Sequence, residues 1–84
     1  MKTLKENTVN VTSMPAPFRL NIFSTPADHP RYFDISALGG KRVAFGYEYA
    51  ENGSDFNGRI TLVVPDGTAQ EIKEFVINKI EEQL

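Results

Sequence analysis

His29 is the one histidine of the chain, and it limits which reactions the sequence could support. Imidazole is the usual general base near neutral pH and a common metal ligand. His29 follows Asp28 and lies between Pro26 and Pro30, so a rigid loop could present an acid beside an imidazole. No second histidine and no cysteine exists to complete a zinc site. We therefore interpret this segment as a solvent-exposed turn and expect no metal.

The other reactive residue types form no catalytic pattern. The four serines lie outside any nucleophile motif, and a serine triad would also need His29. The aspartates match no calcium-binding loop. Gly39-Gly40 followed by Lys41-Arg42 superficially suggests anion binding, but a double glycine before an alternating segment is more typical of a hairpin turn. We expect no catalytic residue, no cofactor and no enzyme activity.

Length and composition restrict how candidate residues can be arranged. A chain of 84 residues is expected to form a single domain over residues 1–84, with one core and no deep cleft. The absence of cysteine fits a reducing compartment. No stretch has enough consecutive apolar residues for a membrane-spanning helix. We therefore expect a cytoplasmic protein with no membrane partner.

A β-hairpin is the clearest structural unit. Apolar side chains alternate with polar or small ones in two segments, 43–49 and 56–64, which is the period of a half-buried strand. Two Asn-Gly pairs, Asn52-Gly53 and Asn57-Gly58, are candidates for the turn between the two strands. A turn at the first pair, Asn52-Gly53, places every apolar side chain on one face and Tyr47 opposite Gly58. A turn at Asn57-Gly58 would pair the apolar strand 59–64 with the polar stretch 51–56, so we predict the turn at Asn52-Gly53.

Further strands are expected before the hairpin. Alternation over residues 32–37 predicts a strand that joins the hairpin through a turn at 39–40, and alternation over 18–23 predicts another. Residues 1–14 are expected either to be loosely held or to add a short edge strand at 9–11. The predicted fold class is α+β: a four-stranded antiparallel β-meander, or a five-stranded one with that edge, and one C-terminal helix on one face.

The C-terminal segment has the signals of a helix. Thr68 with Glu71 three residues later forms a capping box. Ile72, Val76 and Ile80 belong to a broad apolar arc that reaches Leu84. One helix can cover only one face of a sheet, so we expect the other face to stay open.

The open face is the first candidate interaction surface. The predicted pairing brings Asp34, Gly46 and Arg59 into one row, with an ion pair across the glycine, and places Tyr32 beside Glu48. Small residues, aromatic edges and mixed charge suit a partner protein, although scattered groups of this kind are also normal on soluble proteins. The predicted partner-binding residues on this face are Phe23, Tyr32, Asp34, Arg42, Glu48 and Arg59.

A stripe of acidic residues on the helix is the second candidate surface. Glu74, Glu81 and Glu82 lie opposite the apolar arc. Glu81 and Glu82 fall in the last turn, where the helix dipole favours cations. A basic partner would relieve that repulsion, and a plain solvated face is the alternative.

We interpret the chain as a small non-catalytic protein-binding module, of the inhibitor or adaptor type. The alternative is a nucleic-acid-binding protein that uses Arg42, Arg59 and the aromatic side chains of the sheet. That mode needs aromatics on the open face, whereas the predicted register places them under the helix. A net charge of −2 also disfavours phosphate binding. A homodimer through an edge strand or through stacked open faces is a third possibility.

Overall fold

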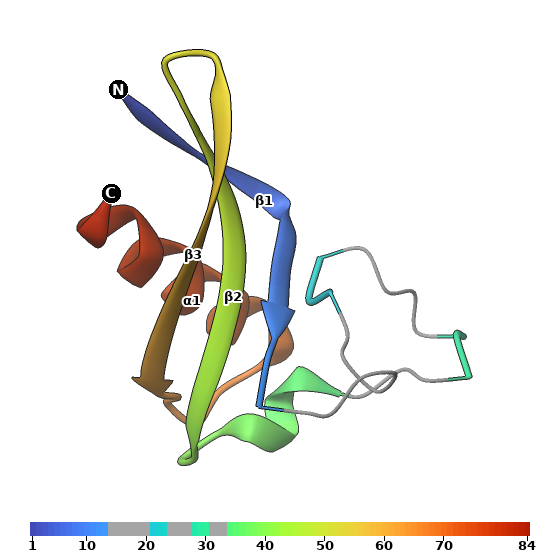
Figure 1. Ribbon diagram of the computed structural model, residues 1–84. Helices are drawn as coiled ribbons and strands as arrows, with labels where there is room; N and C mark the ends of the chain where they lie inside the picture. The colour runs from blue at the N-terminus through green and yellow to red at the C-terminus, as the bar shows by residue number, and fades with distance from the viewer. Residues whose placement is uncertain (14–20, 24–27, 31–33) are drawn as a thin grey trace.

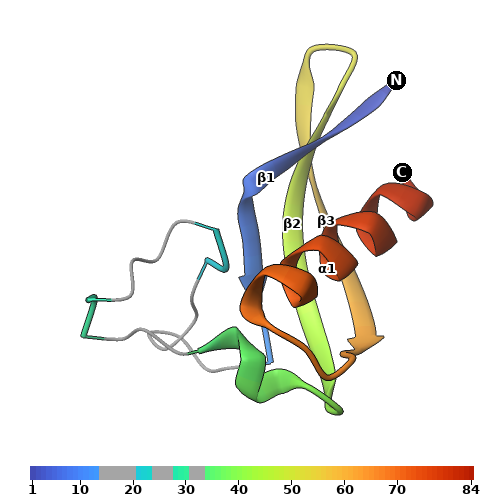
Figure 2. The ribbon, with the colours of Figure 1, turned by 180° about the vertical axis from the view of Figure 1, so that it is seen from behind.

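The computed structural model describes residues 1–13, 21–23, 28–30 and 34–84. Three antiparallel strands form an open sheet in the order β1-β2-β3. They are β1 (Lys2–Val11), β2 (Arg42–Glu51) and β3 (Ser54–Val63). Helix α1 (Ala69–Gln83) crosses one face of the sheet diagonally (Figure 1), and the view from behind shows it in front of the strands (Figure 2). The α+β class with one C-terminal helix is confirmed.

The hairpin forms as the alternation of its residues predicts. Ten residue pairs join β2 to β3, from Arg42 opposite Val63 to Glu51 opposite Ser54. Asn52 and Gly53 make the turn with φ angles of 51° and 79°, in the left-handed region that Asn and Gly tolerate best. The register is therefore confirmed, including Tyr47 opposite Gly58.

Strand β1 is much longer than the short edge expected at residues 9–11. All ten residues from Lys2 to Val11 are in the strand, which pairs with β2 and occupies the place expected for residues 32–37. The pairing is interrupted between Lys5, opposite Glu48, and Asn10, opposite Gly46. More residues of β1 than of β2 lie between those two pairs, so β1 bulges away from its neighbour.

The strand expected over residues 32–37 is wrong in its described part. Ile35–Leu38 forms a short 3-10 helix, η1, and residues 32 and 33 lie outside the described residues. Ile35 and Leu38 are buried, and their spacing of three residues puts them on one side of a 3-10 turn. Asp34 caps this turn by accepting a hydrogen bond of 3.0 Å from the backbone N–H of Ser36. That backbone donor and the Ser36 hydroxyl lower the pKa of Asp34.

Only residues 21–23 of the strand expected at 18–23 are described. Asn21 forms a single bridge with Asn10, and the N–H of Ile22 donates to the carbonyl of Val9 at 3.0 Å. This short contact lies beside β1 and not beside the hairpin. The described residues thus contain three strands, and the expected count of four or five is not confirmed.

Helix α1 begins with the predicted capping box. The Thr68 hydroxyl accepts from the Glu71 N–H at 3.2 Å, and the Glu71 carboxylate accepts from the Thr68 N–H at 3.1 Å. The Thr68 N–H, and after it the Thr68 hydroxyl, lower the pKa of Glu71 by stabilising its carboxylate. The buried side chains that α1 and the sheet share are Val9, Val11, Val43, Phe45, Tyr47, Val64, Ile72, Val76 and Ile80. None of the helices in the described ranges is long and apolar enough to cross a membrane.

Candidate functional site

The face of the sheet opposite α1 carries a shallow polar hollow. Side chains alternate between the two faces of a strand, so burial of Phe45 and Tyr47 under α1 leaves Gly46 and Glu48 on the other side. The hollow has a volume of about 450 Å³. Its lining residues come from all three strands: Thr8, Asn10, Thr12, Gly46, Tyr47, Glu48, Asn57, Gly58 and Arg59.

Gly46 lies in the floor of this hollow, next to the Thr12 side chain. It pairs with Asn10 of β1 on one side and with Arg59 of β3 on the other. A Cβ atom at position 46 would lie 2.8 Å from Cγ2 of Thr12, so a larger residue would clash with one wall. The glycine therefore leaves room for the Thr12 side chain to lie against the sheet backbone.

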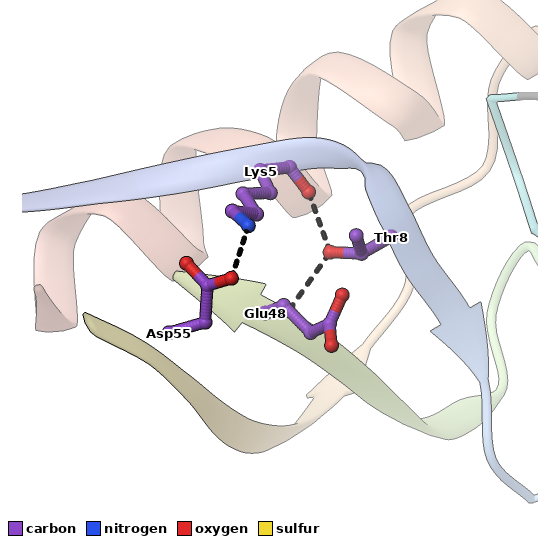
Figure 3. Close-up of polar contacts among 4 residues, drawn as sticks. All are labelled: Lys5, Thr8, Glu48 and Asp55. Atoms are coloured by element: carbon purple, nitrogen blue, oxygen red, sulfur yellow. Dashed lines mark hydrogen bonds and ion pairs between the residues drawn. The ribbon is translucent and has the colours of Figure 1, made fainter. Parts of the chain in front are cut away.

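A threonine hydroxyl repairs the bulge in β1 beside the hollow. The Glu48 N–H donates to Oγ1 of Thr8 at 2.8 Å, and the same hydroxyl donates to the carbonyl of Lys5 at 2.6 Å. Figure 3 shows Thr8 between these two groups. The side chain takes the place of the backbone carbonyl that regular pairing would supply, so the Glu48 N–H keeps an acceptor at the bulge.

Lys5 and Asp55 close one end of the open face. Nζ of Lys5 lies 2.7 Å from Oδ2 of Asp55, and the pair connects β1 to β3 (Figure 3). Both side chains are partly solvent-exposed, so the pair contributes little to stability. It does neutralise the one aspartate of β3, which matters for the charge that β3 presents.

Three predicted partner-binding residues lie on this face as expected. Arg42, Glu48 and Arg59 are all exposed, and none of them forms an ion pair with any residue that the structure describes. Charged groups that are left without an intramolecular partner remain available to a second molecule.

The other three predicted residues are not brought to the hollow. Asp34 caps η1, so the expected ion pair with Arg59 does not form, and Asn10 stands in its place opposite Gly46. Phe23 packs against the core with Lys73 of α1 5.9 Å from its ring, on the helix side of the sheet. Tyr32 lies outside the described residues.

The walls that sequence reasoning missed are Thr8, Asn10 and Thr12. A usable signal was present, because these three polar residues alternate with buried Val9 and Val11. The alternation spans only the last part of β1, and the bulge ends it.

The acidic stripe of α1 is exposed, as predicted. Glu74 accepts a hydrogen bond from Gln70 at 3.2 Å, and Glu82 lies 3.6 Å from Lys79. Glu81 forms part of a second hollow between the end of α1 and the start of β1. The stripe is therefore partly neutralised within the helix, whereas the open face keeps charges that form no ion pair with any described residue.

His29 is exposed in the described segment 28–30. Across the described ranges, no group of three or more His, Cys, Asp or Glu side chains is arranged to hold a metal ion. Comparison of the chain with protein-family models, with curated proteins and with solved structures finds no significant match.

Proposed function

We propose that the chain is a small non-catalytic protein-binding module, of the inhibitor or adaptor type, and that it binds its partner through the open face of the sheet. The observation that carries this proposal is the polar hollow around Gly46, at whose walls Glu48 and Arg59 are exposed and form no ion pair within the described part of the chain. Charges of opposite sign at fixed positions select a complementary surface and orient it.

The character of the hollow favours a macromolecular partner over a small substrate. Sites for small molecules are mostly apolar and enclose their ligand. This hollow is wide and is lined by threonine, asparagine and charged side chains around two glycines. Such a surface resembles the polar rim of a protein interface, where hydrogen bonds and bridging waters are common.

The nucleic-acid alternative has weaker support. Arg42 and Arg59 do lie on the open face and could contact phosphates. Phe45 and Tyr47, however, are buried under α1. Stacking on bases needs exposed rings, so the main source of affinity for single strands is missing on this face.

Affinity capture from the native host with matched variants tests the proposal. Arg59→Glu and Glu48→Arg change the open face, while Glu74→Lys makes a charge reversal on the helix stripe. We expect the same captured protein with the wild type and Glu74→Lys, and its loss with the two open-face variants. Capture that depends on Glu74 and ignores Arg59 would move the interface to the helix. A salt-dependent mobility shift with RNA that Arg42→Ala weakens would favour the nucleic-acid alternative.

A further inference from the structure

Every second residue of β3 has its backbone N–H and C=O groups at the outer edge of the sheet, facing away from β2. Ala44 of β2 donates to the Ser13 hydroxyl at 2.8 Å and accepts from the Thr12 N–H at 2.9 Å, so its backbone groups face β1. In an antiparallel pair, two opposed residues either both direct their backbone N–H and C=O groups toward the other strand or both direct them away from it. Thr61 lies opposite Ala44. Its N–H and C=O therefore face outward, on the side away from β2.

The same argument extends along the strand. The Glu48 N–H faces β1, where it meets Thr8, so Asn57 opposite it also points outward. Because the pattern repeats every second residue, Asp55, Arg59 and Val63 share this orientation. In the described part of the chain, the one hydrogen bond made to this edge joins Nε2 of Gln83 to the Arg59 carbonyl at 3.5 Å. A long unpaired edge of this kind is a template for another strand.

The last turn of α1 lies beside this edge. Figures 1 and 2 both show the C-terminal end of α1 extending past the outer side of β3. Gln83 anchors it there by bonding to the Tyr47 hydroxyl and to the Arg59 carbonyl. Lys79 lies one turn earlier on the same flank of the helix, with Nζ 5.7 Å from the Phe75 ring.

One basic side chain at this edge, that of Arg59, has no ion pair among the described residues. Arg59 lies on the open face, on the side of the sheet away from α1, whereas Lys79 on the helix is paired with Glu82 at 3.6 Å. The aspartate of β3, Asp55, is already paired with Lys5. Val63 adds an apolar contact, because 63% of it is exposed.

We propose that the outer edge of β3 accepts an extended acidic segment of a partner protein as an added strand. A carboxylate of that segment lies against Arg59 on the open face, and an apolar residue four positions away covers Val63. Backbone hydrogen bonds to Asn57, Arg59 and Thr61 hold the segment, as in other cases of strand addition. This inference rests on the proposed function and names the chemistry of the partner.

A second copy of the chain fits the edge less well. Antiparallel self-pairing centred on Arg59 would oppose two arginines. Self-pairing centred on Asn57 would oppose Asp55 to Arg59, but it would take Asp55 from Lys5. It would also bring two helix C-termini together at the axis, since Gln83 contacts Arg59. Two negative helix ends in contact repel each other.

Selection from a displayed library of random linear peptides tests the proposal. We expect the enriched peptides to carry an acidic residue four positions from an apolar one, the spacing that faces Arg59 and Val63. Thr61→Pro removes the outward N–H and should abolish their binding, whereas Thr61→Val keeps that N–H and should leave binding unchanged. Arg59→Glu should weaken binding by about tenfold or more, because it reverses the charge at the centre of the edge.

Several outcomes would overturn the proposal. One is enrichment of basic peptides or of none, and another is equal binding to Thr61→Pro and Thr61→Val. If amide chemical shifts place the enriched peptide on the stripe around Glu74, the proposed function stands and this inference fails. If the free chain sediments as a dimer that Thr61→Pro dissociates, the edge belongs to a second copy. Should Thr61→Pro fail to fold, Arg59→Glu supplies the deciding comparison.

Discussion

The two edge strands of the sheet, β1 and β3, differ in how far their outer sides are buried and hydrogen-bonded within the chain. In β1, Val9 is fully buried, the Thr8 hydroxyl fills the bulge, and the Ile22 N–H bonds to the outer side of the strand. In β3, Val63 is 63% exposed, and the Arg59 carbonyl makes the one hydrogen bond found at the outer edge within the described ranges. Both strands are ten residues long, so length does not explain the contrast.

From this contrast we expect β1 to contribute mainly to stability and the outer side of β3 to contribute mainly to binding. Residues of β1 that pack inward or repair its pairing stabilise the fold, so replacing them should lower the free energy of unfolding. Outward residues of β3 have few contacts within the chain, so replacing them should change binding and leave stability nearly unchanged. Matched substitutions on the two strands can test that division directly.

The largest expected difference is between two valines. Val9→Ala should lower the free energy of unfolding by about 2–3 kcal/mol, because it leaves a cavity between β1 and the core. Val63→Ala should change it by less than about 0.5 kcal/mol, because the side chain is mostly in water. Urea denaturation of the two variants measures both values. Equal losses would show that β3 contributes to the core as much as β1 does.

The inner side of β3 should be as sensitive as β1. A Cβ atom at Gly58 would lie 2.4 Å from a ring carbon of Tyr47, which is 6% exposed. Gly58→Ala should therefore displace the ring and cost about 2 kcal/mol. Tyr47→Ala combined with Gly58→Ala is the control, because without the ring the alanine should cost much less. A neutral Gly58→Ala in the wild type would contradict the packing of Tyr47 over Gly58.

Two threonines give the next comparison. Thr8→Val removes the hydroxyl that bonds to Glu48 and Lys5, and it should cost about 1–2 kcal/mol, because a backbone N–H loses its acceptor. Thr61→Val should be nearly neutral on the exposed edge. Thermal unfolding of the pair measures the difference. If both threonines behave alike, the hydroxyl of Thr8 has no special part in the bulge.

The smallest effect concerns the ion pair that joins the two edges. Lys5→Met should cost about 0.2–1 kcal/mol at low salt, and less at high salt, because both partners are exposed and screened. Asp55→Asn should cost a similar amount, and the double variant should cost little more than either single one. Denaturation at two salt concentrations provides the measurement, and additive losses would show that Lys5 and Asp55 do not interact.

The sequence predicts the hairpin and the helix well because their signals are local. Alternation and one favourable Asn-Gly turn suffice to determine the register of β2 and β3, down to Tyr47 opposite Gly58. The capping box of Thr68 and Glu71 marks the start of α1. Each of these features depends on residues close together in the chain.

Strand β1 and η1 could not be predicted in the same way. The start of β1 is rich in Lys, Glu, Asn and Thr, and its bulge breaks the alternation, so only pairing with distant β2 makes it a strand. Around Ile35, the residues fit both the two-residue period of a strand and the three-residue period of a 3-10 helix. The 3-10 helix forms, and in it both Ile35 and Leu38 are buried in the core. The hollow was missed in part because β1 supplies one of its walls.

Amide hydrogen exchange along β3 tests the central claim most directly. In the monomeric chain, the amides of Asn57, Arg59 and Thr61 should exchange fast and those of Ile60 and Leu62 slowly, because the first set points outward and the second set bonds to β2. Binding of an acidic extended peptide should slow the fast set. Slow exchange at Arg59 and Thr61 in the free monomer would contradict the account, because it would mean that the outer edge of β3 is already paired.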